Sequence, residues 1–286
     1  MSPAVWWPST AARCAPSDVG IDAAVALLAC PTCQQPLTRE EGRLVCRRGH
    51  SFDIAKQGHV NLLGRAAPQN ADTADMVAAR ARFLGAGHYE PIIDALVGRV
   101  RDARRVVEVG AGTGHYLAGV LDSQPRAVGL ATDISPMACR RAAKAHPRIG
   151  AVVADTWAGL PVRSGVADVL LCCFAPRNPV EFARIMAPGG VLLVVTPNEG
   201  HLAQARESLG LLGIQDDKLA KLNRSMAGAF EAVWSQRIRW TMDLDAAAVT
   251  DLVQMGPNAF HEHGAVSEQM SVDADVQLSV FRRPGM

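Results

Sequence analysis

The first residues with recognisable chemistry lie near the start of the chain, where three cysteines and a histidine recur at metal-ligand spacing. Cys30, Cys33, Cys46 and His50 form the pattern C-x2-C-x12-C-x3-H. Three thiolates and one imidazole are typical ligands of closed tetrahedral zinc sites, and four protein ligands leave no position open for a substrate. The pattern therefore predicts a structural zinc ion. The alternative is a set of stray thiols beside a surface histidine.

Basic side chains surround these ligands, namely Arg39, Arg43, Arg47, Arg48 and Lys56. Residues 24–105 carry 12 Lys/Arg against 8 Asp/Glu, whereas residues 106–286 carry 16 against 18. This basic stretch favours contact with phosphates, and a solvated face that only aids solubility is the alternative.

A second group of residues follows a short apolar run in VVEVGAGTGHY, residues 106–116. Gly110, Gly112 and Gly114 would let the backbone turn sharply and expose main-chain N–H groups at a helix start. The nicotinamide fingerprint needs its third glycine one place later, where His115 stands. The spacing therefore argues against a dinucleotide-dependent oxidoreductase.

Two acids stand in register with this glycine loop. Asp133 lies 19 residues beyond Gly114, and Asp155 follows the next apolar run. An acid at the end of the second strand of such a unit binds ribose hydroxyls. A tight turn with two solvated acids is the alternative for each feature taken alone.

These residues need a scaffold, and the second half of the chain alternates short apolar runs with helical stretches. Strands are predicted over 105–110, 127–133, 151–155, 167–174 and 189–197, with helices over 135–145 and 179–187 between them. Apolar strands that alternate with helices indicate a parallel sheet covered on both faces. Residues 230–244 and 275–283 flank a helical stretch, 245–255, and predict a closing antiparallel pair.

The chain divides into four sections on this interpretation. Residues 1–24 form an extension, 25–64 a zinc-binding module, 65–103 a helical linker and 104–286 an α/β domain. In the linker, Asp72 is the predicted N-cap of a helix that stops at Gly85 and Gly87, and Pro91 opens a second helix.

The glycine loop with both acids resembles class I S-adenosylmethionine-dependent methyltransferases. The whole chain from about Val25 to Arg283 resembles the 23S ribosomal RNA guanine-N1 methyltransferases, most of all their actinobacterial, tylosin-resistance-like branch. The resemblance rests on these stretches: CPTC…CRRGHSFDIAKQGHVNLL, ADTADMVAARARFLGAGHYEP, EVGAGTGHY, FAPRNP and PGGVLLVVTP.

The resemblance implies a fold class: an α/β, class I (Rossmann-like) methyltransferase sheet with a small N-terminal zinc module. It implies transfer of a methyl group from S-adenosylmethionine to N1 of a guanine in a 23S rRNA hairpin loop, with resistance to tylosin-type macrolides and a homodimer as further expectations. Residues 25–64 would then recognise the RNA, and residues 104–286 would be the methyltransferase domain.

The same resemblance implies a set of cofactor contacts. The glycine loop would hold the amino-acid part, Asp133 the ribose and Asp155 the adenine amine. The remaining contacts that it implies are Tyr89, Tyr116, Leu117 and His201.

In this family fold, the target base would lie at the FAPRNP loop. Phe174 could stack on the base, and Arg177 or Asn178 could hold its O6 or a neighbouring phosphate. Guanine N1 carries a proton that something must accept, and the sequence identifies no general base.

Alternatives stay open at this point: a methyltransferase that acts on a small molecule or another RNA, and a zinc-dependent RNA-binding protein without activity. No apolar run reaches membrane-spanning length, and the first residues lack the pattern of a signal peptide. Four of the 7 cysteines lack framework spacing, which favours a reducing compartment. A cytoplasmic protein without a membrane partner is therefore expected.

Overall fold

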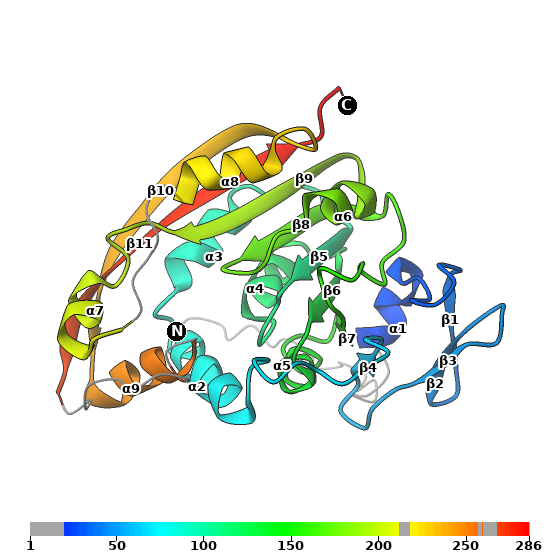
Figure 1. The fold of residues 1–286 in the computed structure, drawn as a ribbon, viewed down its shortest axis with the longest axis horizontal. Coiled ribbons are helices and arrows are strands. Elements are labelled where there is room, and N and C mark those ends of the chain that lie inside the picture. The colour runs from blue at the N-terminus through cyan, green and yellow to red at the C-terminus, as the bar shows by residue number, and fades with distance from the viewer. Residues whose placement is uncertain (1–19, 212–217, 257–258, 260–267, 286) are drawn as a thin grey trace, which may run out of the picture.

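The computed structural model describes residues 20–211, 218–256, 259 and 268–285 (Figure 1). Of the predicted extension over 1–24, residues 1–19 lie outside this part. The remainder forms a short helix, α1 (Gly20–Ala24), continued by the 3-10 turn η1 (Val25–Leu27). A Cβ on Gly20 would lie 2.3 Å from the carbonyl oxygen of Ile149, so α1 is seated closely on the sheet. Residues 20–24 therefore belong to the folded body.

The centre of the molecule is a mixed sheet of eight strands in the order β10-β11-β9-β8-β5-β6-β7-β4. The five strands predicted for the α/β half are all present and pair in parallel. Their bounds are β5 Arg105–Val109, β6 Val128–Asp133, β7 Ile149–Val153, β8 Ala167–Cys173 and β9 Met186–Pro197. The predicted closing pair is confirmed as β10 (Glu231–Leu244) and β11 (Met270–Arg282), which are antiparallel along their length.

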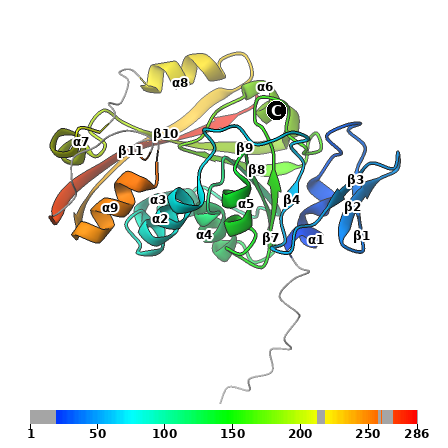
Figure 2. The same cartoon turned by 60° about the horizontal axis from the view of Figure 1, so that its bottom comes forward.

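Helices cover both faces of the sheet (Figure 2). One apolar cluster joins the sheet to α2–α5, α7 and α9, and a second joins its other face to α1, α6 and α8. The bounds are α2 Ala74–Gly85, α3 Glu90–Val97, α4 His115–Ser123, α5 Pro136–Ala142, α6 Pro179–Ile185, α7 Ala203–Leu209, α8 Lys218–Met226 and α9 Ala246–Gln254. Among the described residues, no helix has both the length and the apolar character needed to cross a membrane.

Several local predictions differ from the structure. The N-cap of α2 is Thr73, whose hydroxyl accepts from the backbone N–H of Met76 at 3.3 Å, and not Asp72. Asp72 instead pairs with Arg80. The helix predicted to run to Ala187 ends at Ile185, because Pro188 disfavours helical backbone at the residue before it.

The zinc-binding module carries a three-stranded antiparallel sheet, β1-β2-β3. These strands are β1 Leu37–Glu40, β2 Arg43–Cys46 and β3 Ser51–Asp53. The next strand, β4 (Val60–Asn61), pairs in parallel with β7 and so becomes the edge strand of the main sheet. Leu37, Leu44 and Val60 share an apolar cluster with that sheet. The module is thus joined to the α/β core by side-chain packing and by backbone pairing, and β4 can be followed beside β7 in Figure 1.

The helices of residues 65–103 also pack into the core and do not simply connect two units. Phe83 in α2, and Ile92 and Leu96 in α3, are buried at 0–1% exposure against the sheet. The apolar face of a sheet must be buried against other elements. Helices α2 and α3 cover part of one face of the sheet that β5–β9 form.

Candidate functional site

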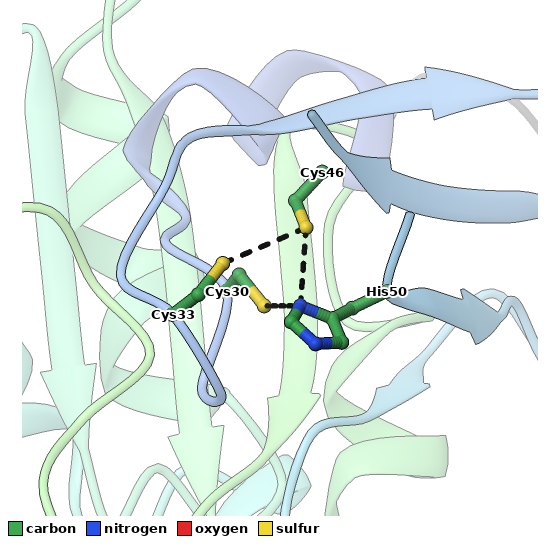
Figure 3. Close-up of side chains that lie close together, drawn as sticks. All are labelled: Cys30, Cys33, Cys46 and His50. Atoms are coloured by element: carbon green, nitrogen blue, oxygen red, sulfur yellow. Dashed lines mark hydrogen bonds between the residues drawn. The ribbon is translucent and has the colours of Figure 1, made fainter. Parts of the chain in front are cut away.

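The four predicted zinc ligands lie together at the base of the module (Figure 3). Their donor atoms all lie within 4.8 Å of one another. Cys30 Sγ is 3.5 Å from His50 Nδ1, Cys46 Sγ is 3.3 Å from the same atom, and Cys33 Sγ is 3.6 Å from Cys46 Sγ. Zinc bonds to sulfur at about 2.3 Å and to nitrogen at about 2.0 Å, so a tetrahedron has edges of about 3.5–3.8 Å. The four side chains therefore fit a closed zinc site.

Two turns hold these ligands. The N–H of Gln34 donates to the carbonyl of Cys30, and the N–H of Gly49 donates to that of Cys46, at 2.8 and 2.9 Å. Gln34 and Gly49 both take left-handed backbone, with φ of 60° and 82°. Burial opposes ionisation of Cys46, but hydrogen bonds from the backbone of Arg48 and His50 and from the side chains of Cys33 and His50 together outweigh it and lower the pKa of this thiol to about 6. That direction favours the thiolate, which is the form that binds metal.

A cavity of about 470 Å³ opens at the carboxyl ends of the central strands. Seven of the nine residues predicted to bind the cofactor line it: Tyr89, Gly110, Gly112, Tyr116, Asp133, Asp155 and His201. The other two lie behind the lining. Gly114 packs on α5, where a Cβ would lie 3.2 Å from Ala142, and the N–H of Leu117 donates to Glu108 at 3.2 Å.

The glycine loop turns tightly between β5 and α4. Gly110 and Gly114 have φ of 65° and 76°, a conformation that glycine adopts without strain. A Cβ on Gly110 would lie 2.4 Å from the Cβ of Ala175, so the loop after β8 also requires a glycine here. Behind the loop, Glu108 is 1% exposed, and burial raises the pKa of this carboxyl well above its usual range.

Both acids lie on the cavity wall and are engaged. Asp133 accepts from the N–H groups of Gly112 and Ser135 at 2.8 and 2.9 Å, and burial raises its pKa. Asp155 accepts from Arg65 at 2.6 Å and from the N–H of Trp157 at 2.9 Å. Arg65 directly follows the zinc module in the chain, so this ion pair links the end of the module to the cavity rim.

Aromatic rings gather in another part of the cavity lining. Tyr89 Oη is 3.2 Å from His201 Nε2, and the N–H of Asp275 donates to His201 Nδ1 at 3.1 Å. A neutral imidazole whose Nδ1 accepts must carry its proton on Nε2, so His201 donates to Tyr89. The Tyr89 hydroxyl can then donate its own proton toward the cavity. Burial raises the pKa of Tyr89, which keeps that hydroxyl protonated.

Phe174 stands at the mouth of the cavity and is 39% exposed. Its ring lies over that of His201, with centroids 6.0 Å apart and planes 23° apart. Its backbone φ is 55°, which is uncommon for a residue with a side chain and typical of functional sites. Phe174 therefore presents an accessible ring face in a conformation that the surrounding loop must impose.

The two other candidates in this loop do not line the cavity. Asn178 caps α6 by accepting from the N–H of Glu181 at 3.3 Å, and its amide donates to the carbonyl of Thr156 at 2.9 Å. Those bonds tie the loop after β8 to the loop after β7. Arg177 lies outside the lining, near Cys172.

Sequence reasoning missed several lining residues, among them Asp72, Arg80, Trp157, Leu252 and Met255. The only sequence signal for Arg80 is its position in the stretch ADTADMVAARARF, which resembles known methyltransferases. Trp157 is 66% exposed at the rim, two residues after Asp155.

Comparisons with known proteins agree with this geometry. Residues 28–65 match the family model of the zinc ribbon described as "RlmA, N-terminal". The chain is 49% identical over 244 residues to the 23S rRNA (guanine(748)-N(1))-methyltransferase of Streptomyces fradiae, covering 83% of this chain and 87% of that protein. It is 45% identical over 285 residues, 89% of this chain and 97% of the other, to a Micromonospora griseorubida protein provisionally named a 23S rRNA (guanine-N(1)-)-methyltransferase.

Solved structures resemble the chain in fold. One comes from the complex between the Haloferax volcanii Trm112 methyltransferase activator and a methyltransferase. It superposes with a TM-score of 0.52 at 18% identity, covering 74% of this chain and 98% of that chain.

Proposed function

This chain belongs to the family of 23S rRNA (guanine-N1)-methyltransferases, and we propose that it takes its guanine from a hairpin loop and seats it against Phe174. It is an enzyme that uses S-adenosylmethionine and carries a structural zinc ion. The observation that supports the position of the base is the accessible Phe174 ring at the mouth of the cavity that the glycine loop and both acids line.

The cofactor would lie between the glycine loop and the two strand ends. Asp133 would accept from the ribose hydroxyls, and Asp155 from the adenine amine. Tyr89 would also donate to the cofactor, held in place by His201. The bound cofactor supplies an electrophilic methyl group on a sulfonium, a chemistry that depends mainly on positioning.

Phe174 would stack on the extruded guanine and fix its plane. Bases that undergo chemistry are taken out of the stack and read in a pocket lined by apolar rings. Burial raises the pKa values of Tyr89, Tyr116 and Cys173, so these lining groups stay protonated and are poor bases. The guanine N1 proton would therefore leave through water at the cavity mouth, and the chain contributes orientation.

The zinc module would grip the RNA backbone. Arg47, Arg48 and Lys56 are exposed, and no ion pair is found for them among the described residues. Arg39 and Arg43 are partly neutralised by Asp22 and Glu40 at 2.7 and 2.8 Å. Phosphates of a folded hairpin would lie on the three uncompensated cations, while residues 104–286 carry the chemistry. A homodimer and tylosin-type resistance are further parts of this proposal.

The test is methylation of 23S rRNA by the purified chain with S-adenosylmethionine, followed by primer extension. N1-methylguanine blocks base pairing, so the expected product is one new stop in a hairpin loop. Mass spectrometry of the nuclease fragment should assign the mark to N1. A transcript with adenine at that guanine is the matched control and should give no stop. A mark on another atom, or equal transfer to the control, would contradict the proposal.

A further inference from the structure

Arg80 lies against the glycine loop inside the cavity. A Cβ placed on Gly112 would lie 3.0 Å from Arg80 Nη1, so the guanidinium occupies the space beside the loop backbone. Among the described lining residues, Arg80 alone carries a permanent positive charge. Its side chain is 22% exposed, so solvent screens that charge only in part.

The guanidinium is held by two neighbours. It donates to the carboxylate of Asp72 and to the carbonyl of Met255, which belong to two segments far apart in the sequence that both line the cavity. Asp72 also lines the cavity and is 23% exposed. Its own carbonyl accepts from the hydroxyl of Ser135 at 2.7 Å, which fixes the approach of the residue 72 loop. The cavity therefore presents a positive and a negative side chain next to each other.

We propose that the Arg80–Asp72 pair recognises the amino-acid end of S-adenosylmethionine, with Arg80 on its carboxylate and Asp72 on its ammonium. The inference rests on the proposed function only in that the ligand is this cofactor. A zwitterion carries one charge of each sign a few ångströms apart, which matches this pair. The carboxylate would also lie at the N-terminus of α4, where helix N–H groups favour an anion.

This placement orients the rest of the cofactor. Asp133 and Asp155 lie at the ends of β6 and β7, and carboxylates there suit hydroxyl and amine donors and repel a carboxylate. Arg80 is therefore a cofactor-binding residue, and its planar fork suits a carboxylate better than a lysine would.

The competing explanation is that Arg80 only fastens α2 to the loops around it. The chain offers a matched control in Arg82, two residues further along α2. Arg82 pairs with Asp251 of α9 at 2.6 Å and is absent from the cavity lining. Arg82→Gln therefore removes a bridge between α2 and α9 without removing a side chain that lines the cavity.

The experiment measures Kd for S-adenosylhomocysteine and for 5′-methylthioadenosine, which lacks both charged groups of the amino-acid end. Arg80→Gln should raise Kd for S-adenosylhomocysteine by about ten- to a hundredfold, the range expected for a lost charge-assisted hydrogen bond. It should raise Kd for 5′-methylthioadenosine by less than about twofold. Arg80→Lys should lose less affinity for S-adenosylhomocysteine than Arg80→Gln does. Arg82→Gln should leave both constants within about twofold.

Equal losses with both ligands, or no loss with either, would overturn the inference. Asp72→Asn is the second variant, and it should show the same preference for loss with the charged ligand even if Arg80→Gln does not fold. A wild-type chain that binds both ligands as expected and leaves 23S rRNA unmethylated would refute the proposed RNA substrate and leave this inference standing.

Discussion

Phe174 has the features expected of a side chain that binds a base. It combines an exposed ring, left-handed backbone and a place at the cavity mouth. Strained backbone persists only where the surroundings impose it, and here the N–H of Phe174 is held by the carbonyl of Val195 at 3.0 Å. The residue is therefore set by β9 to present its ring.

Replacing Phe174 with leucine should keep an apolar side chain and remove the flat face. Stacking of a base on an aromatic ring contributes about 1–3 kcal/mol, so kcat/KM for RNA should fall about five- to a hundredfold. Kd for S-adenosylhomocysteine should stay within about twofold. Val180→Ala, at an apolar side chain that is 75% exposed outside the cavity, is the control and should change neither value. If Phe174→Leu weakened only the binding of S-adenosylhomocysteine, Phe174 would not be part of the site that binds the base.

The buried carboxyl of Glu108 should make the stability of the chain depend on pH. Burial raises the folded-state pKa of this carboxyl above its unfolded value of about 4.3, so the folded chain binds the proton more tightly. Between those two pKa values stability falls as pH rises, by at most about 1.4 kcal/mol per pH unit. Glu108→Gln keeps an acceptor for the N–H of Leu117 and removes the titration.

The free energy of unfolding of Glu108→Gln relative to wild type should therefore increase as pH rises above about 4.3. Urea titrations at a series of pH values measure this difference. The exposed Glu41→Gln should show a flat difference over the same range. A flat profile for Glu108→Gln would mean that the buried carboxyl has an ordinary pKa.

At the scale of elements, the zinc module contributes a strand to the main sheet. Its strand β4 extends the sheet at β7, and β7 leads directly to Asp155. The ion pair of Arg65 with Asp155 gives a second link between the module and the cavity. Loss of the metal should therefore affect the α/β core as well as the surface proposed to bind RNA.

Cys30→Ser should lose bound zinc and lower the free energy of unfolding by more than about 4 kcal/mol, since loss of a metal is among the few single changes with so large an effect. Metal analysis and denaturant unfolding measure the two quantities. Cys139→Ala is the control, because its thiol donates to the carbonyl of Val152 away from the cluster, and it should keep one zinc per chain. A Cys30→Ser chain that bound zinc as tightly as the wild type would show that Cys30 is not a ligand.

At the scale of the whole molecule, charge is separated along the chain. Residues 24–105 carry 12 basic against 8 acidic residues, whereas residues 106–286 carry 16 against 18. RNA should therefore associate through the zinc module, and affinity should fall as salt rises because bound counterions are released.

Replacing Arg47 and Arg48 with glutamine should lower the slope of log Kd against log salt by about 0.7–0.9 for each phosphate that the variant no longer neutralises. Filter binding with a 23S hairpin at several salt concentrations measures the slope. Arg126→Gln, an exposed change just before β6 and so at the end of the strands opposite the cavity, should leave the slope unchanged. Equal slopes for the wild type and both variants would show that Arg47 and Arg48 do not contact RNA phosphates.

The local order of residues was enough to predict the zinc ligands, the five parallel strands and the glycine loop. Each of these features depends on spacing within a short segment. Two closely spaced ligand pairs predict the zinc site, apolar runs predict the strands, and glycines after a strand predict the turn. The resemblance to known methyltransferases, which added Tyr89 and His201, depended on longer stretches of the same kind.

Only the tertiary structure brought β4 beside β7, Tyr89 beside His201 and Arg80 between Gly112 and Met255. Those partners are separated by tens to hundreds of residues; Arg80 and Met255 are 175 apart. No periodicity links such residues, because their contact follows from how loops close and helices pack on the sheet. The metal ligands could therefore be predicted from the sequence, whereas the charged pair beside the glycine loop became visible only in the folded chain.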